Sequence, residues 1–137
     1  NIAVQVAGTY DVVYDTNAGT ITVSEKFWGI TGSIAAHGLN WNGDLKMSED
    51  NGVWTGYATL ATTDAFKFRK DADWAENYGA PGNTEPAVVA LGEPFEAVAG
   101  GKNMAVPQDG YYKLVLDTNN KTITVTLDSN TGTAALR

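Results

Sequence analysis

One segment of this chain occurs twice. Residues 1–23 align without a gap on residues 103–125, at an offset of 102 residues, and 13 of the 23 aligned positions are identical. An offset of about 100 residues is the length of one small β-sandwich module. The repeat therefore predicts the end of one module followed by a complete one. We expect residues 1–26 to be the closing hairpin of a preceding repeat, 27–128 to be a complete β-sandwich and 129–137 to be a C-terminal tail.

Most of the chain carries the pattern of half-buried strands. Apolar and polar residues alternate, Val, Ile, Thr, Tyr and Trp are frequent, and Gly, Asn, Asp and Pro separate the segments. The pattern predicts an all-β chain with an immunoglobulin-like β-sandwich fold. A long loop over residues 80–101 is expected to shape one wall of a site. The expected strands lie near residues 2–6, 9–15, 20–25, 27–32, 52–60, 65–71, 94–98, 103–106, 110–117 and 121–127.

Both copies of the repeat contain an Asp-Thr-Asn turn between two strands. The turns begin at Asp15 and at Asp117, and Thr-Ile-Thr-Val follows each of them. Asp and Asn side chains hydrogen-bond to nearby backbone groups, which favours a β-hairpin turn. Asp-x-Asn also begins calcium loops, but the later ligands of such a loop are missing. We therefore expect no metal and no cofactor.

Composition narrows the classes of partner. With 137 residues, 43% of them hydrophobic, the chain can build one modest core. It contains no cysteine, which excludes disulfides and thiolate chemistry. Its net charge of −7 opposes nucleic-acid binding, because that binding depends on Lys and Arg. No apolar stretch approaches the ~20 residues of a membrane span, so a signal or lipid anchor is expected only upstream.

The four tryptophans occur in two kinds of setting. Trp28 and Trp54 share strand faces with aliphatic residues and are expected in the core. Trp41 and Trp74 lie among Asn, Asp, Gly and Glu, which are poor neighbours for a core ring, so both are expected to be exposed. The flat apolar face of an exposed Trp suits the face of a pyranose ring. The alternative is that each ring folds over an edge of the sandwich.

A strand with cations on one face runs toward Trp74. Phe66 and Phe68 are expected to point inward, and Lys67 and Arg69 outward. The two cations supply donors that suit vicinal hydroxyls. The alternative is a solvated face on which they pair with neighbouring carboxylates, namely Asp71, Asp73 and Glu76.

The order of these residues resembles the modules of SusE and SusF-like proteins, which are starch-binding lipoproteins of the Gram-negative outer membrane surface. The likeness covers residues 27–127. The chain is also similar to the glycogen-binding module of the AMP-activated kinase β subunit, which has the same Trp, Lys, Trp, Asn order. The motifs that carry the resemblance are Trp41, Leu45, Met47, Gly52-Val53-Trp54, Phe66-Lys67-Phe68, Asp73-Trp74, Asn77-Tyr78-Gly79, Gly101-Lys102-Asn103 and Gly110-Tyr111-Tyr112.

The resemblance implies a site for a curved α-glucan. Trp41 and Trp74 would be the two walls of an aromatic cradle, with Lys67 as the hydroxyl donor between them. Asn103 would correspond to an amide that hydrogen-bonds a neighbouring glucose. Two further contacts would come from Arg69 and Asn77. The family also implies a cell-surface, outer-membrane location with the anchor outside this segment, and it implies other modules of the same polypeptide and glycan-uptake proteins as partners.

An enzyme is not expected. A glycosidase needs two carboxyl groups about 5–9.5 Å apart, one with a raised pKa, and no candidate lies in an apolar segment. His37 has no catalytic partner suggested by the sequence. We therefore expect a non-catalytic starch-binding module, with a structural or adhesion repeat as the alternative. Because both exposed tryptophans lie outside the duplicated segment, one binding site is expected. The carboxylates considered are Asp71, Asp73, Glu76, Glu85, Glu93 and Glu96.

Overall fold

The structure, a computed structural model, describes residues 9–17 and 19–129. These residues are mostly strands, and no α-helix occurs among them; a 3-10 turn, η1 (Ala35–His37), follows the first strand of the sandwich. The expected strand near residues 2–6 and most of the expected tail lie outside the described ranges. The prediction of an all-β chain is confirmed.

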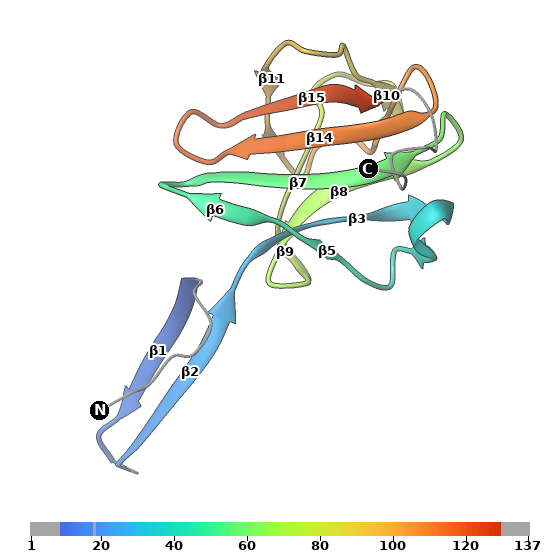
Figure 1. Cartoon of the computed structure of the whole chain (residues 1–137). Helices are drawn as coiled ribbons and strands as arrows, with labels where there is room; N and C mark the ends of the chain where they lie inside the picture. Colours follow the sequence, from blue (N-terminus) through green and yellow to red (C-terminus); the bar gives the residue numbers. More distant parts are fainter. Residues whose placement is uncertain (1–8, 18, 130–137) are drawn as a thin grey trace.

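Two sheets pack together into a β-sandwich, and a separate hairpin precedes them (Figure 1). The hairpin consists of β1 (Thr9–Asp15) and β2 (Thr20–Lys26). Within the described residues the large sheet has eight strands: β3 (Trp28–Ile34), β4 (Leu39–Asn40), β5 (Leu45–Lys46), β8 (Ala65–Lys70), β9 (Asp73–Gly79), β10 (Ala87–Val88), β12 (Val98–Ala99) and β13 (Met104–Ala105). The small sheet has five: β6 (Ser48–Asp50), β7 (Val53–Leu60), β11 (Phe95–Glu96), β14 (Gly110–Asp117) and β15 (Thr122–Ser129).

The strand order places β8 at the centre of the large sheet. The order is β10-β13-β8-β3-β4, β5 also pairs with β3, and β9 pairs with β8 and β12. The small sheet runs β11-β15-β14-β7-β6. The predicted β-sandwich is confirmed, whereas its immunoglobulin-like strand order stays a prediction.

The hydrophobic core lies between the sheets and follows the alternation of the strands. Along β14, Tyr112, Leu114 and Leu116 are fully buried, while the residues between them are exposed or half-buried. The core is completed by other fully buried side chains: Ile30, Ile34, Leu60, Phe66, Phe68, Met104, Ile123 and Val125.

Aromatic contacts fill the core on the side of the large sheet. The rings of Phe66 and Phe68 meet edge to face, with centroids 6.3 Å apart. Trp28 stacks on Tyr78 at 5.1 Å. Trp28 and Trp54 are only 6% and 7% exposed, which confirms that both are core residues.

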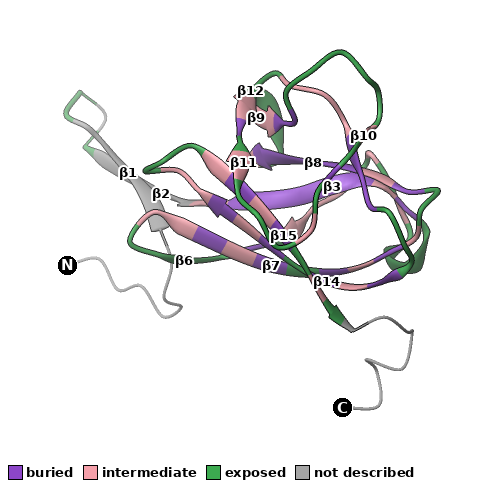
Figure 2. Cartoon of the chain, turned by 90° about the horizontal axis from the view of Figure 1, so that it is seen from above, coloured by how far each residue is buried: buried purple, intermediate pink, exposed green. Residues whose placement is uncertain are grey.

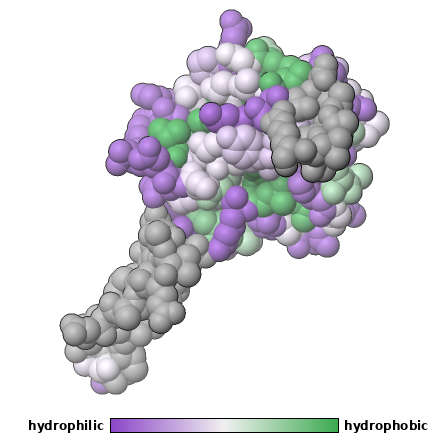
Figure 3. All heavy atoms as spheres, viewed as in Figure 1, coloured by the Kyte–Doolittle hydropathy of each residue, from purple (hydrophilic) through white to green (hydrophobic). Residues whose placement is uncertain are grey.

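Figure 2 shows that the two sheets differ in how they are covered. Strand β7 alternates between buried and more exposed residues, as expected of a strand with one face toward solvent. Strands β3 and β8 are buried along nearly their whole length. A further layer of chain must therefore cover the outer face of the large sheet. On the molecular face in Figure 3, apolar patches are separated by hydrophilic residues.

The predicted strands agree with the structure where apolar alternation is strong. The segments expected near 9–15, 20–25, 27–32, 52–60, 65–71, 103–106, 110–117 and 121–127 are all strands, with ends that differ by a few residues. The strand expected near 94–98 is divided into β11 and β12, which belong to different sheets. Strand β9 was not among the predicted strands, because its exposed residues do not alternate. Four strands of two or three residues were not expected: β4, β5, β6 and β10.

The Asp-Thr-Asn turn of the second repeat has the predicted hydrogen bonds. The Asp117 carboxylate accepts from the backbone N–H groups of Asn119 at 2.9 Å and Asn120 at 3.1 Å. It also accepts from the Asn120 side chain at 2.8 Å. The bonds from Asn120 hold the pKa of Asp117 below its ordinary value. Two other polar groups of the turn bind the β6–β7 connection: the Thr118 hydroxyl donates to the Gly52 oxygen at 2.6 Å, and the Asn119 side chain donates to the Asn51 oxygen at 2.7 Å.

Replacing Tyr112 by Phe tests the packing of the small sheet. The Tyr112 hydroxyl donates to the backbone oxygen of Gln108 at 2.5 Å, from a fully buried ring. Tyr112→Phe should lower the free energy of unfolding by about 0.5–1.5 kcal/mol in urea titrations. Tyr57→Phe is the matched control on the neighbouring strand, because Tyr57 is 46% exposed. The control should change stability by less than about 0.5 kcal/mol, and equal losses in both variants would contradict the prediction.

Candidate functional site

A loop folds over the outer face of the large sheet between two short strands. Strands β4 and β5 both pair with β3, and residues 41–44 connect them. Two hydrogen bonds fasten this connection to β3: the Trp41 N–H donates to the Gly32 oxygen at 2.9 Å, and the Thr31 hydroxyl donates to the Gly43 oxygen at 2.8 Å. This loop is part of the layer that covers β3 and β8.

The loop is also held by a buried ion pair. Arg69 on β8 grips the Asp44 carboxylate with two nitrogens: Nε lies 2.8 Å from Oδ2, and Nη2 lies 2.6 Å from Oδ1. The side chains are only 8% and 6% exposed. Gly29 leaves the space for this contact, because a Cβ there would lie 2.9 Å from the Asp44 Cβ. The pair joins the loop to the sheet beneath it.

Trp74 reaches the same face from the other side of β8. The hairpin of β8 and β9 turns through Asp71 and Ala72, both with positive φ near 55°, as in a type I′ turn. Arg69 then pairs with Asn77, and Lys70 pairs with Asp73. Residues 74–76 therefore have no partner on β8 and form a bulge, a feature that re-aims side chains.

Trp41 and Trp74, the two tryptophans with polar sequence neighbours, meet over the cations of β8. The ring centroids of Trp41 and Trp74 are 5.9 Å apart, and the ring planes are inclined by 43°. Arg69 Cζ lies 4.9 Å from the Trp74 centroid, and Lys67 Nζ lies 5.8 Å from it. These are cation–π distances. We call these four residues the tryptophan platform.

The exposure of the platform differs in part from the prediction. Trp74 is 42% exposed, as expected, and Trp41 is half-buried. Lys67 and Arg69 point away from the core, but they are only 8% and 6% exposed, so the expectation of two freely exposed donors is wrong. The reason is the covering layer: Trp74 lies over both cations, and Asp44 takes the Arg69 guanidinium. The two rings touch each other, so a ligand would lie across them rather than between them.

Trp41 has a strained backbone. Its φ is +62°, in the left-handed region that bulky residues seldom adopt. Such a conformation costs about 1–3 kcal/mol and persists where surrounding contacts enforce it. The hydrogen bond to Gly32 and the anchors at Gly43 and Asp44 supply those contacts. The strain places the Trp41 ring against Trp74.

The two cations of the platform differ in how their charge is balanced. Hydrogen bonding to Asp44 raises the pKa of Arg69 above its ordinary value, with the charges of Asp44 and Asp73 adding to the effect against burial. Burial lowers the pKa of Lys67, and the negative charge of Glu85 offsets only part of this. Within the described ranges no carboxylate lies within ion-pair distance of Lys67. The described part of the chain therefore leaves the N–H donors of the Lys67 ammonium without an ion pair.

The two predicted amide contacts lie in different settings. The Asn77 side chain donates to the Trp74 backbone oxygen at 2.9 Å and so supports the bulge, while its Oδ1 is buried without a hydrogen-bond partner in the described part of the chain. Asn103 directly precedes Met104, the register partner of Phe66. Continuing that antiparallel register by one residue places Asn103 beside Lys67. The structure thus brings five predicted site residues together and places Asn103 directly before the neighbouring strand β13.

Sequence reasoning missed the residues that support the platform. Asp44, Gly29 and Thr31 were not predicted, because each acts on a residue distant in the chain. The one signal was the run Asn-Gly-Asp after Trp41, which reads as an ordinary turn.

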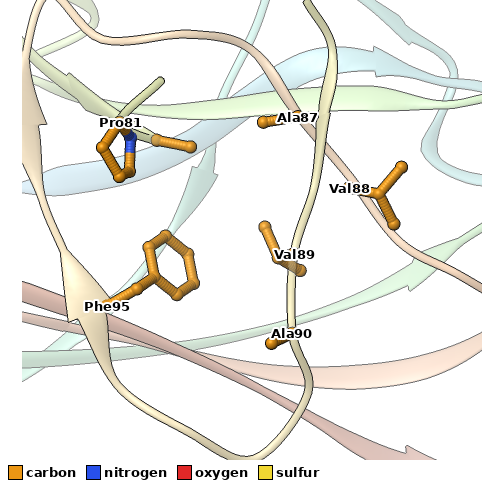
Figure 4. A pocket seen from close by; sticks show the side chains of 7 residues that line it. Pro81, Ala87, Val88, Val89, Ala90 and Phe95 are labelled. Carbon is orange, nitrogen blue, oxygen red and sulfur yellow. The ribbon is translucent and has the colours of Figure 1, made fainter. Parts of the chain in front are cut away.

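The irregular segment 80–101, which was expected to shape one wall of a site, contributes Ala99 and Gly100 to a pocket of about 270 Å³ beside Glu76 and Asn77. It also lines a second pocket, which is apolar. Figure 4 shows Val89 and Ala87 facing Pro81 and Phe95 across it. Its volume is about 200 Å³, and Ala80, Val88 and Ala90 complete the lining. It has no charged side chain in its lining and contains none of the platform residues. The tryptophan platform is therefore the better candidate site for a polar ligand.

Comparisons with protein-family models and with curated protein sequences find no match for this chain. None of the helical turns in residues 9–17 and 19–129 has the length and apolar character needed to cross a membrane. In the same ranges, no group of three or more His, Asp or Glu side chains is arranged to hold a metal ion.

The variant Asp44→Ala tests the support of the platform. It would leave the Arg69 guanidinium buried without its partner, so the free energy of unfolding should fall by about 3–5 kcal/mol in denaturant titrations. Glu76→Ala is the control, because Glu76 pairs with Lys70 at 3.4 Å on the surface and is 63% exposed. That variant should lose less than about 1 kcal/mol.

The double variant Asp44→Ala with Arg69→Met separates a lost attraction from a stranded charge. Removing both charges should restore part of the stability that Asp44→Ala loses, because the uncompensated cation is gone. Equal losses from Asp44→Ala and Glu76→Ala would show that the buried pair does not support this loop.

Proposed function

We propose that this chain is a non-catalytic carbohydrate-binding module that binds α-glucan, such as starch or maltooligosaccharide, on the tryptophan platform. The observation that carries the proposal is the contact of Trp41 with Trp74 at 5.9 Å, above the two cations of β8. The two rings come from segments far apart in the chain, and one is strained and the other bulged to reach this position. Contact between a half-buried ring and an exposed one, both at the surface, favours a shared ligand surface.

The chemistry of the platform suits a sugar. An exposed aromatic face packs against the C–H face of a pyranose, and adjacent N–H donors meet its hydroxyls. The planes of Trp41 and Trp74 are inclined by 43°, which fits a chain whose successive rings turn. An α-glucan is such a chain, whereas a β-1,4-glucan is a flatter ribbon.

The two cations have different parts in this proposal. Arg69 already gives two nitrogens to Asp44, so it chiefly supports Trp74 from below. Among residues 9–17 and 19–129, Lys67 has no such carboxylate partner, and in this proposal it is the principal hydroxyl donor. Asn103, directly before β13 and beside Lys67 in the continued register, is the second donor and also an acceptor. Asn77 holds the backbone of Trp74.

Asp44, the carboxylate that contacts the platform, is better explained by a binding module than by an enzyme. Asp44 accepts Arg69 with both oxygens, which leaves it poorly placed to accept or release a proton. A shallow platform should bind weakly, with a dissociation constant of ~10 µM to 1 mM. Repeated modules on a cell-surface lipoprotein of the outer membrane, beside glycan-uptake proteins, would raise the effective concentration for each further contact.

A titration with Trp74→Ala tests the proposal. Maltoheptaose and cellohexaose are added to the wild type while tryptophan fluorescence is followed. Maltoheptaose alone should change the signal, and Trp74→Ala should weaken its binding by about tenfold or more, which corresponds to 1.4 kcal/mol. Tyr57→Ala is the matched control, because Tyr57 is about as exposed as Trp74 but lies on the small sheet.

Circular dichroism confirms that each variant is folded before the affinities are compared. No response of the folded wild type to either glucan would reject the proposal and favour a structural or adhesion repeat. Equal weakening by Trp74→Ala and Tyr57→Ala would place the ligand elsewhere.

Lys67→Met tests the donor separately from the fold. Burial disfavours the charged Lys67, so removing its charge should leave the free energy of unfolding unchanged or higher. Maltoheptaose affinity should nevertheless fall by about tenfold, because a donor is lost. Lys113→Met, at an exposed position of β14, should leave affinity unchanged.

The pH dependence gives a second measurement on Lys67. Its folded-state pKa is lowered, so stability increases as pH rises from that lowered pKa to the ordinary lysine value of 10.5. Affinity should decline over the same range as the ammonium loses its proton. A decline of equal size in Lys67→Met would contradict the assigned role.

A further inference from the structure

The hairpin β1–β2 stands apart from the sandwich. Figure 1 shows it extending away from the two sheets, joined to them where β2 continues into β3. Within the described residues it forms a sheet of its own, in which β1 pairs with β2 and with no other strand. A two-stranded hairpin is at best marginally stable alone in water. Neither outer edge of the hairpin is paired with another strand in the described part of the chain.

The hairpin reproduces the pairing of the last two strands of the sandwich. In β1–β2, Val12 pairs with Val23 and Asp15 with Thr20. At the offset of 102 residues, these become the pairs Leu114 with Val125 and Asp117 with Thr122 of β14–β15. In the sandwich, the outer edge of β14 pairs with β7 and that of β15 pairs with β11.

We propose that β1–β2 closes a second sandwich of the same topology, placed before this one in the same polypeptide. A strand equivalent to β7 would pair along β1, and a strand equivalent to β11 would pair along β2. The partner is thus a β-sandwich module that lacks its own last hairpin.

The apolar positions of the hairpin support this partner. The five fully buried positions of β14–β15 all have apolar or aromatic counterparts in the hairpin sequence, whereas half-buried Leu127 corresponds to Glu25. Apolar residues at every second position are the pattern of strands with one face toward a core. The equivalent pairs are Tyr10 with Tyr112, Val12 with Leu114, Tyr14 with Leu116, Ile21 with Ile123 and Val23 with Val125.

A second copy of this chain is a poorer partner than a preceding module. In each copy the edges of β7 and β11 are already occupied by its own β14–β15. Pairing with the hairpin of another copy would require those strands to leave. A preceding module that ends in residues 1–26 has no such competitor.

The junction would hold this preceding module in a fixed direction. Phe27 alone separates β2 from β3. The Asp71 N–H donates to the Phe27 oxygen at 2.7 Å, and the Phe27 N–H donates to Asp71 Oδ1 at 3.0 Å. Lys26 Nζ lies 3.7 Å from Asp71 Oδ2, and Lys46 Nζ lies 5.0 Å from the Phe27 ring centroid. Asp71 belongs to the β8–β9 turn, so the junction is fastened to the hairpin that carries Trp74.

An extended chain tests the proposal. Residues 27–102 are added before residue 1 of the full chain, so that the new joint, Lys102 to Asn1, repeats the natural joint of Lys102 to Asn103. Hydrogen exchange of residues 9–26 is measured by mass spectrometry in the parent and extended chains. Protection should rise by more than about tenfold in the extended chain and approach that of residues 111–128.

Two variants of the extended chain make the readout specific. Val12→Asp, at the position equivalent to buried Leu114, should abolish the gain in protection. Val13→Asp, equivalent to half-buried Val115 on the outer face, should retain it. This test does not depend on glucan binding.

An unchanged exchange rate in the extended chain would overturn the proposal. The added segment already folds onto residues 103–129 in this structure, so such a failure would lie with the hairpin. A parent chain that dimerises in light scattering and already protects residues 9–26 would show instead that a second copy is the partner.

Discussion

The ion pair between Asp44 and Arg69 determines the architecture of the candidate site. It lies on the outer face of a sheet, where side chains usually meet water, yet both partners are almost fully buried. Desolvating two charges offsets much of their attraction, so such a pair contributes little net stability compared with apolar residues of the same shape. The pair does fix geometry: the guanidinium donates to both carboxylate oxygens in one orientation, and this determines where the loop after Trp41 crosses β3 and β8.

Three locally unfavourable features then gather around that pair. Trp41 has a left-handed backbone, Lys67 carries a desolvated ammonium, and Asn77 has a buried oxygen without a partner among the described residues. Each costs stability, and each lies on or beside the tryptophan platform. In the small sheet, the long strands β7 and β14 alternate simply, and their inner-face residues are buried. Sequences that fold well keep their local preferences consistent, and exceptions concentrated at one place indicate a site kept for a function other than stability.

The sequence predicted what depends on local pattern. The core faces of β8 and β14, the core positions of Trp28 and Trp54, and the hydrogen bonds of the Asp117 turn follow from alternation and turn chemistry. The resemblance also grouped Trp41 with Trp74, and the structure brings their rings into contact.

The features of the site that depend on contacts across the sheet could not be predicted from local sequence pattern. Period-two alternation places Lys67 and Arg69 on the outer face, but it cannot show that a loop from residues 41–44 covers that face. Asp44 reads as a turn residue until Arg69 lies beside it. A bulge breaks the pattern of β9, since residues 74–76 have no partners on β8.

The junction at Phe27 would affect how two linked modules of a tandem protein bind one polymer. With a flexible linker, the effective concentration of a second site depends on linker length, and ligands of many shapes can bridge two sites. One residue held by both its N–H and its oxygen leaves little such freedom. If a preceding module closes on β1–β2, the two modules have a fixed relative orientation. A polymer then binds both sites at once, and so more tightly, only when its own curvature matches that orientation. Repetition would then select for the shape of the glucan as well as strengthen its binding.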